Sequence, residues 1–336
     1  MLDRSAAAPS RGSLMERATV CDLTLPFDAG SAGREEVLDR YHRTGVGYVS
    51  LTVGSDLSGG TGRVLHNIAD VRQMIADGSD RMMFVRSVAD IRAARKAGKL
   101  AVGFHFQGSA PLESNPHLVE VFYELGIRHM LLVYNQMNAA ATGCHERVDA
   151  GLSRYGLRLV AEMNRVGMLV DCTHTGYRAT MEIMEASAAP VIFSHSNARA
   201  VWDHERNITD EQALACARTG GIVGVTGVGK FMSARGTAEV ADLMPHIRHF
   251  ADLIGPDRVA IGVDNVYYLG DEYYRMFARH PDRWPNGYPP PPWHYFAPEQ
   301  IPALADALLD AGFSETHARG ILGENFLRVA ERVWRH

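Results

Sequence analysis

The 336-residue sequence contains only four cysteines, and they lie too far apart to form a motif. They are Cys21, Cys144, Cys172 and Cys216. No two of them show the CxxC spacing of a zinc knuckle, and the closely spaced even set typical of a disulfide framework is lacking. We therefore expect free thiols, which suit a reducing, cytoplasmic location.

The chain also lacks long apolar runs and any concentration of one charge. No run approaches the roughly 20 apolar residues that span a bilayer, and the first residues carry charges without the apolar core of roughly 7–15 residues found in signal peptides. The net charge is −5 and the isoelectric point is near 6.3, with no basic stripe. We expect neither a membrane nor a nucleic-acid partner.

Short apolar runs that alternate with helical patterns are abundant instead. Hydrophobic residues make up 46% of the chain and charged residues 22%, which permits a large core. Eight βα units of this kind favour an α/β fold, a closed (β/α)8 TIM barrel. A ninth run at 82–85 is interpreted as part of an insertion. The eight expected strands lie near 19–24, 46–52, 100–106, 128–133, 167–172, 190–194, 221–226 and 258–263.

No repeat, low-complexity tract or linker divides the chain, so we expect one barrel domain over 19–336 after a flexible N-terminal arm at 1–18. The composition changes only at 267–298, which is rich in proline and aromatic residues. This segment is either an ordered extended loop over the barrel mouth or a plain surface insertion. Two C-terminal helices, at 298–310 and 314–334, are expected to cover the outside of the barrel.

Two histidines follow neighbouring predicted strands. His174 comes just after the run 168–172, and His195 comes just after 190–194. Because the carboxyl ends of parallel strands meet at one edge of a sheet, the two side chains should lie side by side. A single histidine at a strand end is usually a loop residue. Two converging imidazoles indicate a metal site, and both interpretations stay open at this point.

Other polar residues end predicted strands as well. Asp22 and Thr24 share one face of the first strand, because side chains alternate along a strand. His105 and Gln107 end the third strand in the same way. Any of these residues is also a candidate for a hydrogen-bonding plug in the barrel mouth. Asp264 follows the apolar run VAIGV, where a carboxylate needs a charged or donor partner, so catalysis is favoured for it.

Two further segments carry polar residues near the same edge. Arg206, in DHERNITDE, has the planar fork that binds a substrate carboxylate, although a local salt bridge is the alternative. Asn135, in VYNQMN, is ordinarily explained by turn chemistry. The motif GVTGVGK at 224–230 nearly matches a phosphate-binding loop. Phe231 stands where a magnesium-binding Ser or Thr is required, so we do not expect phosphate binding.

With these residues in view, the sequence resembles the membrane dipeptidase (renal dipeptidase) family of zinc peptidases, which have amidohydrolase-like barrels. The resemblance extends over about 20–333, and its motifs are EMNRVGMLVDCTHTGYR, PVIFSHSNARAV, HERNITDE, GGIVGV, IGVD and GENFLRV. It implies that the TIM barrel is of the metal-dependent hydrolase type, and that the protein hydrolyses the peptide bond of dipeptides, L,D-dipeptides included. Many members are dimers, so the resemblance also makes a homodimer a candidate assembly.

The resemblance implies roles for the substrate-facing residues. Asp264 matches the acid/base residue that handles the proton of the attacking water and of the leaving amine. Arg206 matches the arginine that grips the substrate. Tyr134 stands in the place of a histidine that helps to polarise the scissile carbonyl, and we group the adjacent Asn135 with these substrate contacts.

The metal ligands match the family only in part. His174 and His195 correspond to the two imidazoles of one zinc, whereas the family's bridging glutamate falls on Gln107. The family's His-x-Asp pair, which holds the other zinc, falls on Asp22 and Thr24 in the first strand. A neutral amide bridges two cations poorly, so two zinc ions about 3.5–4 Å apart are disfavoured. We expect at most one firmly bound zinc on the two histidines. Its remaining ligands are expected among Asp22, Gln107, His105 and Thr24.

Three functions remain after the sequence analysis. The first is a dipeptidase that works with one zinc. The second is a repurposed family member with little or no zinc, which performs non-hydrolytic acid/base chemistry on an amino-acid-derived metabolite. The departures in the ligand set favour the second, and the retained histidines and acid/base residue favour the first. A third is a binding or scaffold protein without catalysis, against which the retained acid/base residue argues.

Overall fold

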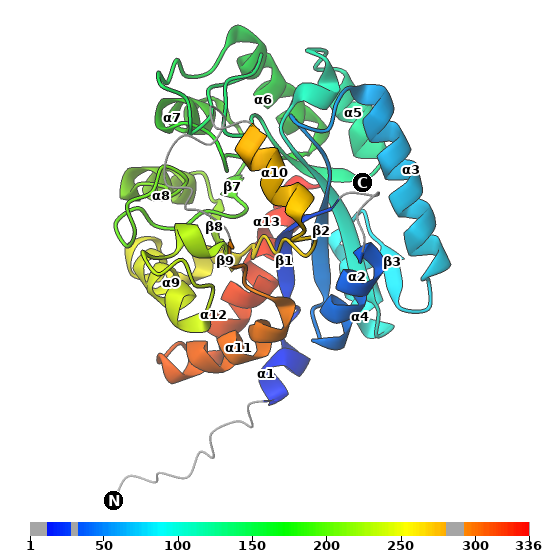
Figure 1. The fold of residues 1–336 in the computed structure, drawn as a ribbon, viewed down its shortest axis with the longest axis vertical. Coiled ribbons are helices and arrows are strands. Elements are labelled where there is room, and N and C mark those ends of the chain that lie inside the picture. Colours follow the sequence, from blue (N-terminus) through cyan, green and yellow to red (C-terminus); the bar gives the residue numbers. More distant parts are fainter. Residues whose placement is uncertain (1–11, 28–32, 280–291, 336) are drawn as a thin grey trace, which may run out of the picture.

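A parallel sheet forms the centre of the computed structural model, which describes residues 12–27, 33–279 and 292–335. Eight strands follow the chain around a nearly closed barrel, and the order is β1-β2-β4-β5-β6-β7-β8-β9 (Figure 1). The (β/α)8 barrel prediction is therefore confirmed. The strands are β1 (Cys21–Pro26), β2 (Tyr48–Ser55), β3 (Met82–Phe84), β4 (Leu100–Gln107), β5 (Ile127–Leu131), β6 (Leu169–Asp171), β7 (Val191–Phe193), β8 (Ile222–Val225) and β9 (Val259–Ile261).

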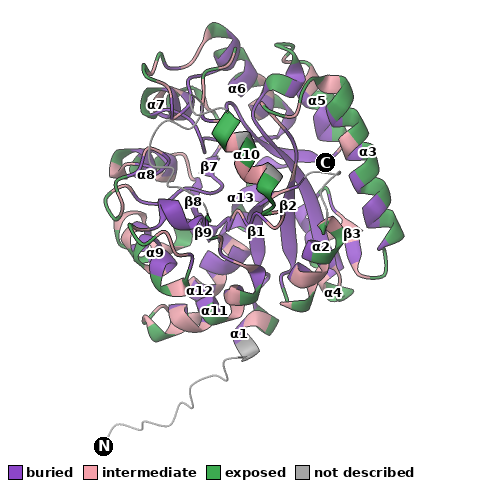
Figure 2. Ribbon diagram, in the orientation of Figure 1, coloured by how far each residue is buried: buried purple, intermediate pink, exposed green. Residues whose placement is uncertain are grey.

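Each expected strand is present, with ends shifted by a few residues. The ninth run forms β3, which pairs with β4 off the main path, as the interpretation of an insertion requires. The strands are short and buried because both faces of a barrel strand are covered, by the interior on one side and by helices on the other. Figure 2 shows buried strands inside a ring of helices whose outer faces are exposed.

The helices surround the barrel. None of them, among the described residues, combines the length and apolar character needed to span a bilayer. They are α1 (Gly12–Arg17), α2 (Arg34–Arg43), α3 (Thr61–Asp77), α4 (Val88–Lys96), α5 (Leu118–Glu124), α6 (Arg154–Val166), α7 (Tyr177–Ala186), α8 (Asp210–Arg218), α9 (Val240–Ile254), α10 (Asp271–Arg279), α11 (Ile301–Asp310), α12 (Glu315–Arg319) and α13 (Asn325–Val333).

Two predicted irregular segments are partly helical. Residues 1–11 of the expected N-terminal arm lie outside the described residues, but the arm's last part forms α1, and Leu14 and Ala18 are buried. Helix α10 lies within the proline-rich segment 267–298, of which residues 280–291 lie outside the described residues. Trp293 and Phe296 are buried. The described parts of both segments therefore pack against the barrel.

The C-terminal helices differ from the expectation that they cover only the outside. The apolar face of α13 packs against residues near the starts of the strands and closes that end of the barrel, where Phe326 stacks on Tyr48 at 5.5 Å between ring centroids. The helix predicted over 314–334 is also broken near Gly323. A Cβ atom there would lie 2.2 Å from the carbonyl oxygen of Thr19, so the approach of the chain before β1 requires a glycine.

Candidate active site at the barrel mouth

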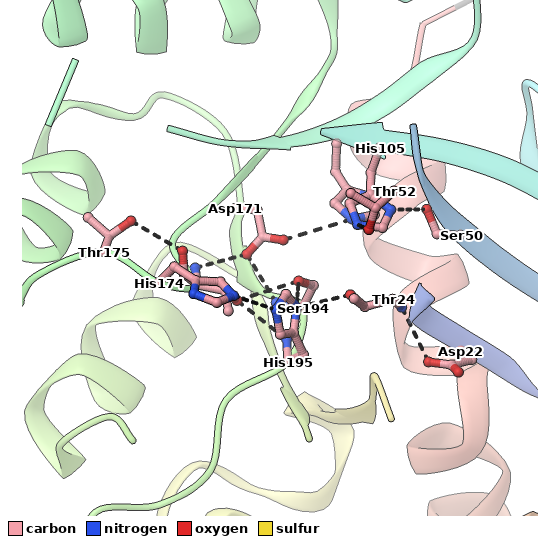
Figure 3. A network of polar contacts seen from close by, with 12 residues as sticks. Asp22, Thr24, Ser50, Thr52, His105, Asp171, His174, Thr175, Ser194 and His195 are labelled. Atoms are coloured by element: carbon pink, nitrogen blue, oxygen red, sulfur yellow. Dashed lines mark hydrogen bonds and ion pairs between the residues drawn. The ribbon is translucent and has the colours of Figure 1, made fainter. Parts of the chain in front are cut away.

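The two predicted histidines meet at the carboxyl ends of β6 and β7. Their Nε2 atoms lie 3.1 Å apart, and both side chains are buried (Figure 3). Two nitrogens bound at 2.0–2.1 Å to one tetrahedral zinc are about 3.3 Å apart, so the spacing of His174 and His195 suits two ligands of one ion.

Neighbouring side chains orient both imidazoles. The amide oxygen of Asn135 lies 2.6 Å from Nδ1 of His174, so this nitrogen carries the proton and Nε2 keeps its lone pair. Nδ1 of His195 faces the hydroxyl groups of Ser194 at 2.7 Å and Thr24 at 2.9 Å. A hydroxyl group both donates and accepts hydrogen bonds, so these contacts are compatible with either tautomer of His195. Burial lowers the pKa of both imidazoles, so they are neutral at pH 7.

An acidic residue that we did not single out in the sequence anchors the two histidine loops. Oδ1 of Asp171, at the end of β6, accepts hydrogen bonds from the backbone N–H of Thr173 at 3.0 Å and of Ser194 at 3.1 Å. The residues before His174 and His195 are thus tied to one carboxylate. An aspartate within the apolar run MLVDC is the signal that points to this role.

Arg206 is directed at the histidine pair. Its Nη2 lies 3.3 Å from Nε2 of His174 and donates to the backbone oxygen of His195 at 3.1 Å, and the side chain is buried. Its Nε is buried without a hydrogen-bond partner. The neighbouring Asp203 and Glu205 contact other side chains, so Arg206 faces the barrel interior rather than a local salt bridge.

Asp264 follows β9 and lines the same pocket as His174. Burial raises the pKa of Asp264 to about 6, although Arg206 and Lys230 act in the opposite direction. The ring of Tyr134 lies over His174, with 4.1 Å between centroids. A proton acceptor, a phenol and the histidine pair therefore converge at the barrel mouth.

Asp264, Tyr134 and His174 line a pocket of about 1100 Å³. Its outer wall includes Arg63, His66 and Asp70 on one face of α3, and α10 contributes to its aromatic wall. The volume is ample for a dipeptide with large side chains. The aromatic residues that line it are Phe27, Tyr134, Phe231, Tyr268, Tyr273, Phe277 and Tyr295.

Asp22 does not join the histidine pair. Its Oδ1 accepts from the backbone N–H of Val263 at 2.8 Å and of Thr24 at 3.2 Å, and its Oδ2 accepts from the hydroxyl of Tyr41 at 2.6 Å. Burial raises the pKa of Asp22 to about 7, although these hydrogen bonds oppose the change. Figure 3 shows Asp22 beyond Thr24, away from His195. Its carboxylate links β1, the first strand of the barrel, to the residue Val263 just after β9, the last strand.

The other predicted ligands are placed differently. Both ring nitrogens of His105 contact hydroxyl groups at 2.9 Å, those of Ser50 and Thr52, so its lone pairs are not directed at the pair. Thr24 contacts the far nitrogen of His195. Gln107 lines the pocket, and its Nε2 is buried without a partner. A half-turn of the amide about its last side-chain bond would place the amide oxygen, a hydrogen-bond acceptor, at this position instead.

The donor set fits a zinc site only in part. Within the described ranges, no three His, Cys, Asp or Glu side chains are grouped to hold a metal ion. The histidine pair supplies two neutral ligands, and a guanidinium lies against one of their lone pairs. The residues therefore do not fit a two-metal centre. One ion would fit only with Arg206 turned away from His174 and with further ligands beside the two imidazoles.

Comparison with known proteins gives consistent family matches. A family model described as membrane dipeptidase, peptidase family M19, matches residues 40–270. An uncharacterized dipeptidase, C965.12, from Schizosaccharomyces pombe is 32% identical over 60% of this chain and 50% of its own length. Dipeptidase verJ from Clonostachys rogersoniana is 29% identical over 80% of this chain and 64% of its own. The chain thus spans between half and two thirds of these relatives.

Solved structures match along nearly the whole chain. An amidohydrolase from Pseudomonas aeruginosa has a TM-score of 0.87 and 30% identity, and the match covers 97% of this chain and 99% of that one. A metallo peptidase from Rhodobacter sphaeroides, liganded with a phosphinate mimic of L-Ala-D-Ala, has a TM-score of 0.79 and 20% identity over 94% and 99%. The second match is too distant in sequence to show more than the fold.

Proposed function

Because the chain belongs to the membrane dipeptidase family, peptidase family M19, we propose that it hydrolyses the peptide bond of dipeptide-like substrates, L,D-dipeptides included. One observation carries the proposal. His174 and Asp264 line a pocket large enough for a dipeptide, and His195 and Arg206 contact His174. The similarity to the dipeptidases of Schizosaccharomyces pombe and Clonostachys rogersoniana supports this substrate class.

The side chains divide the work of hydrolysis. Above pH about 6 Asp264 is a carboxylate, so it accepts a proton as water attacks the carbonyl carbon, and it returns that proton to the amine when the C–N bond breaks. Burial raises the pKa of Tyr134, so it remains a phenol that donates a hydrogen bond to the carbonyl oxygen. Arg206 turns from His174 to bind the substrate carboxylate.

A single zinc on His174, His195 and Gln107 would lower the pKa of a bound water to about 7. Asn135 prepares His174 for this role because it fixes the tautomer. The four free thiols support the proposal of a reducing, cytoplasmic location. A homodimer remains a prediction.

A second candidate function is metal-independent acid/base chemistry on an amino-acid-derived substrate. The observation that favours it is the guanidinium of Arg206, which lies 3.3 Å from the lone pair that zinc requires. A cation in that position opposes a dication electrostatically. In this arrangement His195 donates from Nε2 to His174, and the pair relays a proton near Asp264.

Zinc titration by calorimetry, combined with hydrolysis of L-Ala-L-Ala and L-Ala-D-Ala with and without a chelator, tests the proposal. We expect one zinc per chain and loss of hydrolysis on chelation. His195→Ala should abolish both, while His117→Ala, a change at an exposed histidine, should preserve both. Hydrolysis that survives chelation would contradict the zinc requirement. Absence of hydrolysis at any zinc concentration would reject the peptidase and leave the second candidate.

A further inference from the structure

Lys230 lies in the glycine-rich motif GVTGVGK, and its glycines serve packing. A Cβ atom on Gly227 would lie 2.3 Å from Cβ of Phe296, and one on Gly229 would lie 2.2 Å from the backbone oxygen of Gly236. The motif ends in a single turn of 3₁₀ helix, η2 (Gly229–Phe231), directly beyond β8. Close approach of neighbouring segments therefore explains the glycines, and the lysine needs an explanation of its own.

The amino group of Lys230 is buried at the wall of the active-site pocket. The residue is 7% exposed and lines the same pocket as Asp264, Tyr134 and His174. Its Nζ lies 3.3 Å from the ring centroid of Trp293. A cation over an indole face is attracted by the ring electrons, more strongly when it is shielded from water. The contact holds the cation beside the reacting groups.

The fold preorganises this contact. The backbone N–H of Gly229 donates to the oxygen of His294 at 2.9 Å, and Val228 forms an antiparallel bridge with Tyr295, so Trp293 is brought beside Lys230. Phe277 of α10 packs edge-on against Trp293, with 4.5 Å between centroids. A side chain that is already ordered loses little entropy when it binds a ligand.

The charges at this end of the pocket favour a bound anion. Arg206 and Lys230 both act on the carboxylate of Asp264 and lower its pKa against the effect of burial. Burial holds the pKa of Lys230 well below its usual range, and Asp264 acts in the opposite direction. Arg206 and Lys230 thus both act on Asp264 in a partly desolvated site. An anionic group of a ligand beside Lys230 would favour the protonated form of the lysine and form a charge-assisted hydrogen bond with it.

We propose that Lys230 binds an acidic group on the substrate side chain, so that the preferred substrates are dipeptides that contain Glu or Asp. The inference rests on the proposed peptidase function, in which Arg206 binds the main-chain carboxylate. Lys230 then selects the second carboxylate. A charge-assisted hydrogen bond at a buried site predicts a preference of about 10- to 100-fold over a neutral side chain of the same shape.

The test compares L-Ala-L-Glu with L-Ala-L-Gln, and the L,D-forms of each, by calorimetric affinity and by kcat/KM. These pairs have the same shape and differ in one charge. The wild-type protein should prefer the acidic member by at least about 10-fold. Lys230→Met, or Lys230→Gln if the first variant fails to fold, should bring the ratio close to one. Lys230→Arg should keep part of the preference.

Arg63→Gln is the matched control, because Arg63 is an exposed cation on the outer wall of the same pocket. It should leave the Glu/Gln ratio as in wild type. If the preference for Glu over Gln is lost in Arg63→Gln, the preference depends on the general positive charge around the pocket. That result would overturn the specific role of Lys230.

The remaining outcomes separate the two proposals. Equal use of both dipeptides by the wild type, or a preference that survives Lys230→Met, overturns the role of Lys230 and leaves the peptidase function intact. Preferential binding of the acidic dipeptide without hydrolysis supports Lys230 and rejects the peptidase function. Failure to bind any of the dipeptides overturns both.

Discussion

Three residues of the candidate site have a backbone conformation that side chains rarely adopt. Asn135, His174 and Asp264 have φ values of 60°, 67° and 56°. Such positions cost of order 1 kcal/mol or more for residues other than glycine, with asparagine the most tolerant. Elsewhere in the described part of the chain, only Glu113 and Ser114 share this conformation without being glycine. The strain therefore gathers where the orientation of a side chain matters for chemistry.

Asp264 should control the pH dependence of hydrolysis. Its raised pKa of about 6 means that the carboxylate needed to accept a proton forms as the pH rises through 6, so kcat/KM should fall below that pH. Asp264→Asn should reduce kcat by roughly 10²- to 10⁴-fold. Activity profiles between pH 4.5 and 8.5 check both effects.

Asp70→Asn is the control for this profile, since Asp70 is an exposed carboxylate at the pocket rim. This variant should show the same fall in kcat/KM below pH about 6 as the wild type, which we call the acid limb of the profile. Replacing Lys230 by Met should move the limb to higher pH, because Lys230 lowers the pKa of Asp264. An Asp264→Asn variant that retains wild-type activity would contradict the assignment.

The sequence predicts which residues reach the site better than it predicts what each one contacts. His174, His195 and Asp264 follow strands, so the geometry of a parallel sheet places them at one edge. Arg206 is also brought there, but its contact with His174 depends on the loop after β7. Asp22 stands at a ligand position of the family, and its true partners lie elsewhere in the chain. Local patterns do not contain such pairings.

Among the strands, β1 and β9 end the strand path, and side-chain chemistry helps to join them. The carboxylate of Asp22 on β1 accepts from the N–H of Val263 just beyond β9, and the N–H of Asp264 donates to the oxygen of Thr24 at 3.1 Å. Tyr41 of α2 holds the second oxygen of Asp22. The residue that the sequence predicted as a metal ligand thus helps to close the barrel.

Asp22→Ala should therefore destabilise the fold by about 2–4 kcal/mol, because the N–H of Val263 and the hydroxyl of Tyr41 lose their acceptor. Asp22→Asn is the matched control. Its amide oxygen accepts from Val263 and its NH₂ group donates to the oxygen of Tyr41, so most of the stability should remain. Urea denaturation followed by circular dichroism measures both. Equal destabilisation by Asn and Ala would show that charge, rather than hydrogen bonding, is required.

The strands were predictable because short apolar runs separated by helical patterns have few alternative arrangements. The ends of the C-terminal helices were not. A pattern from 314 to 334 reads as one helix, and the interruption near Gly323 arises because the chain before β1 passes close by. The position of α13 against the strand starts likewise depends on long-range packing.

At the scale of the molecule, the two ends of the barrel differ in character. Polar side chains gather at the carboxyl ends of the strands, whereas the opposite end is closed by apolar residues of α13. In TIM barrels the carboxyl ends of the strands typically hold the active site, and the opposite end contributes mainly to stability.

Phe326→Ala tests this separation. Removing the fully buried ring beneath the barrel should lower the free energy of unfolding by about 3–5 kcal/mol, because the cavity cannot be refilled. The site lies at the other end, so kcat/KM measured well below the melting temperature should change little. Leu157→Ala, at a residue that is 48% exposed, is the control and should have a small effect on stability. A stability loss for Phe326→Ala no larger than the control would show that α13 is not needed to close the barrel.

The hydrogen bond between Asp22 and Val263 joins residues 241 positions apart. During synthesis, β1 can pair with β2 early, but its contact with the residues after β9 forms only when most of the chain has left the ribosome. The wall formed by Trp293 and Tyr295 emerges later still. Contacts of such long range slow folding. A nascent chain released before β9 should consequently carry His174 and His195 and still have no assembled pocket.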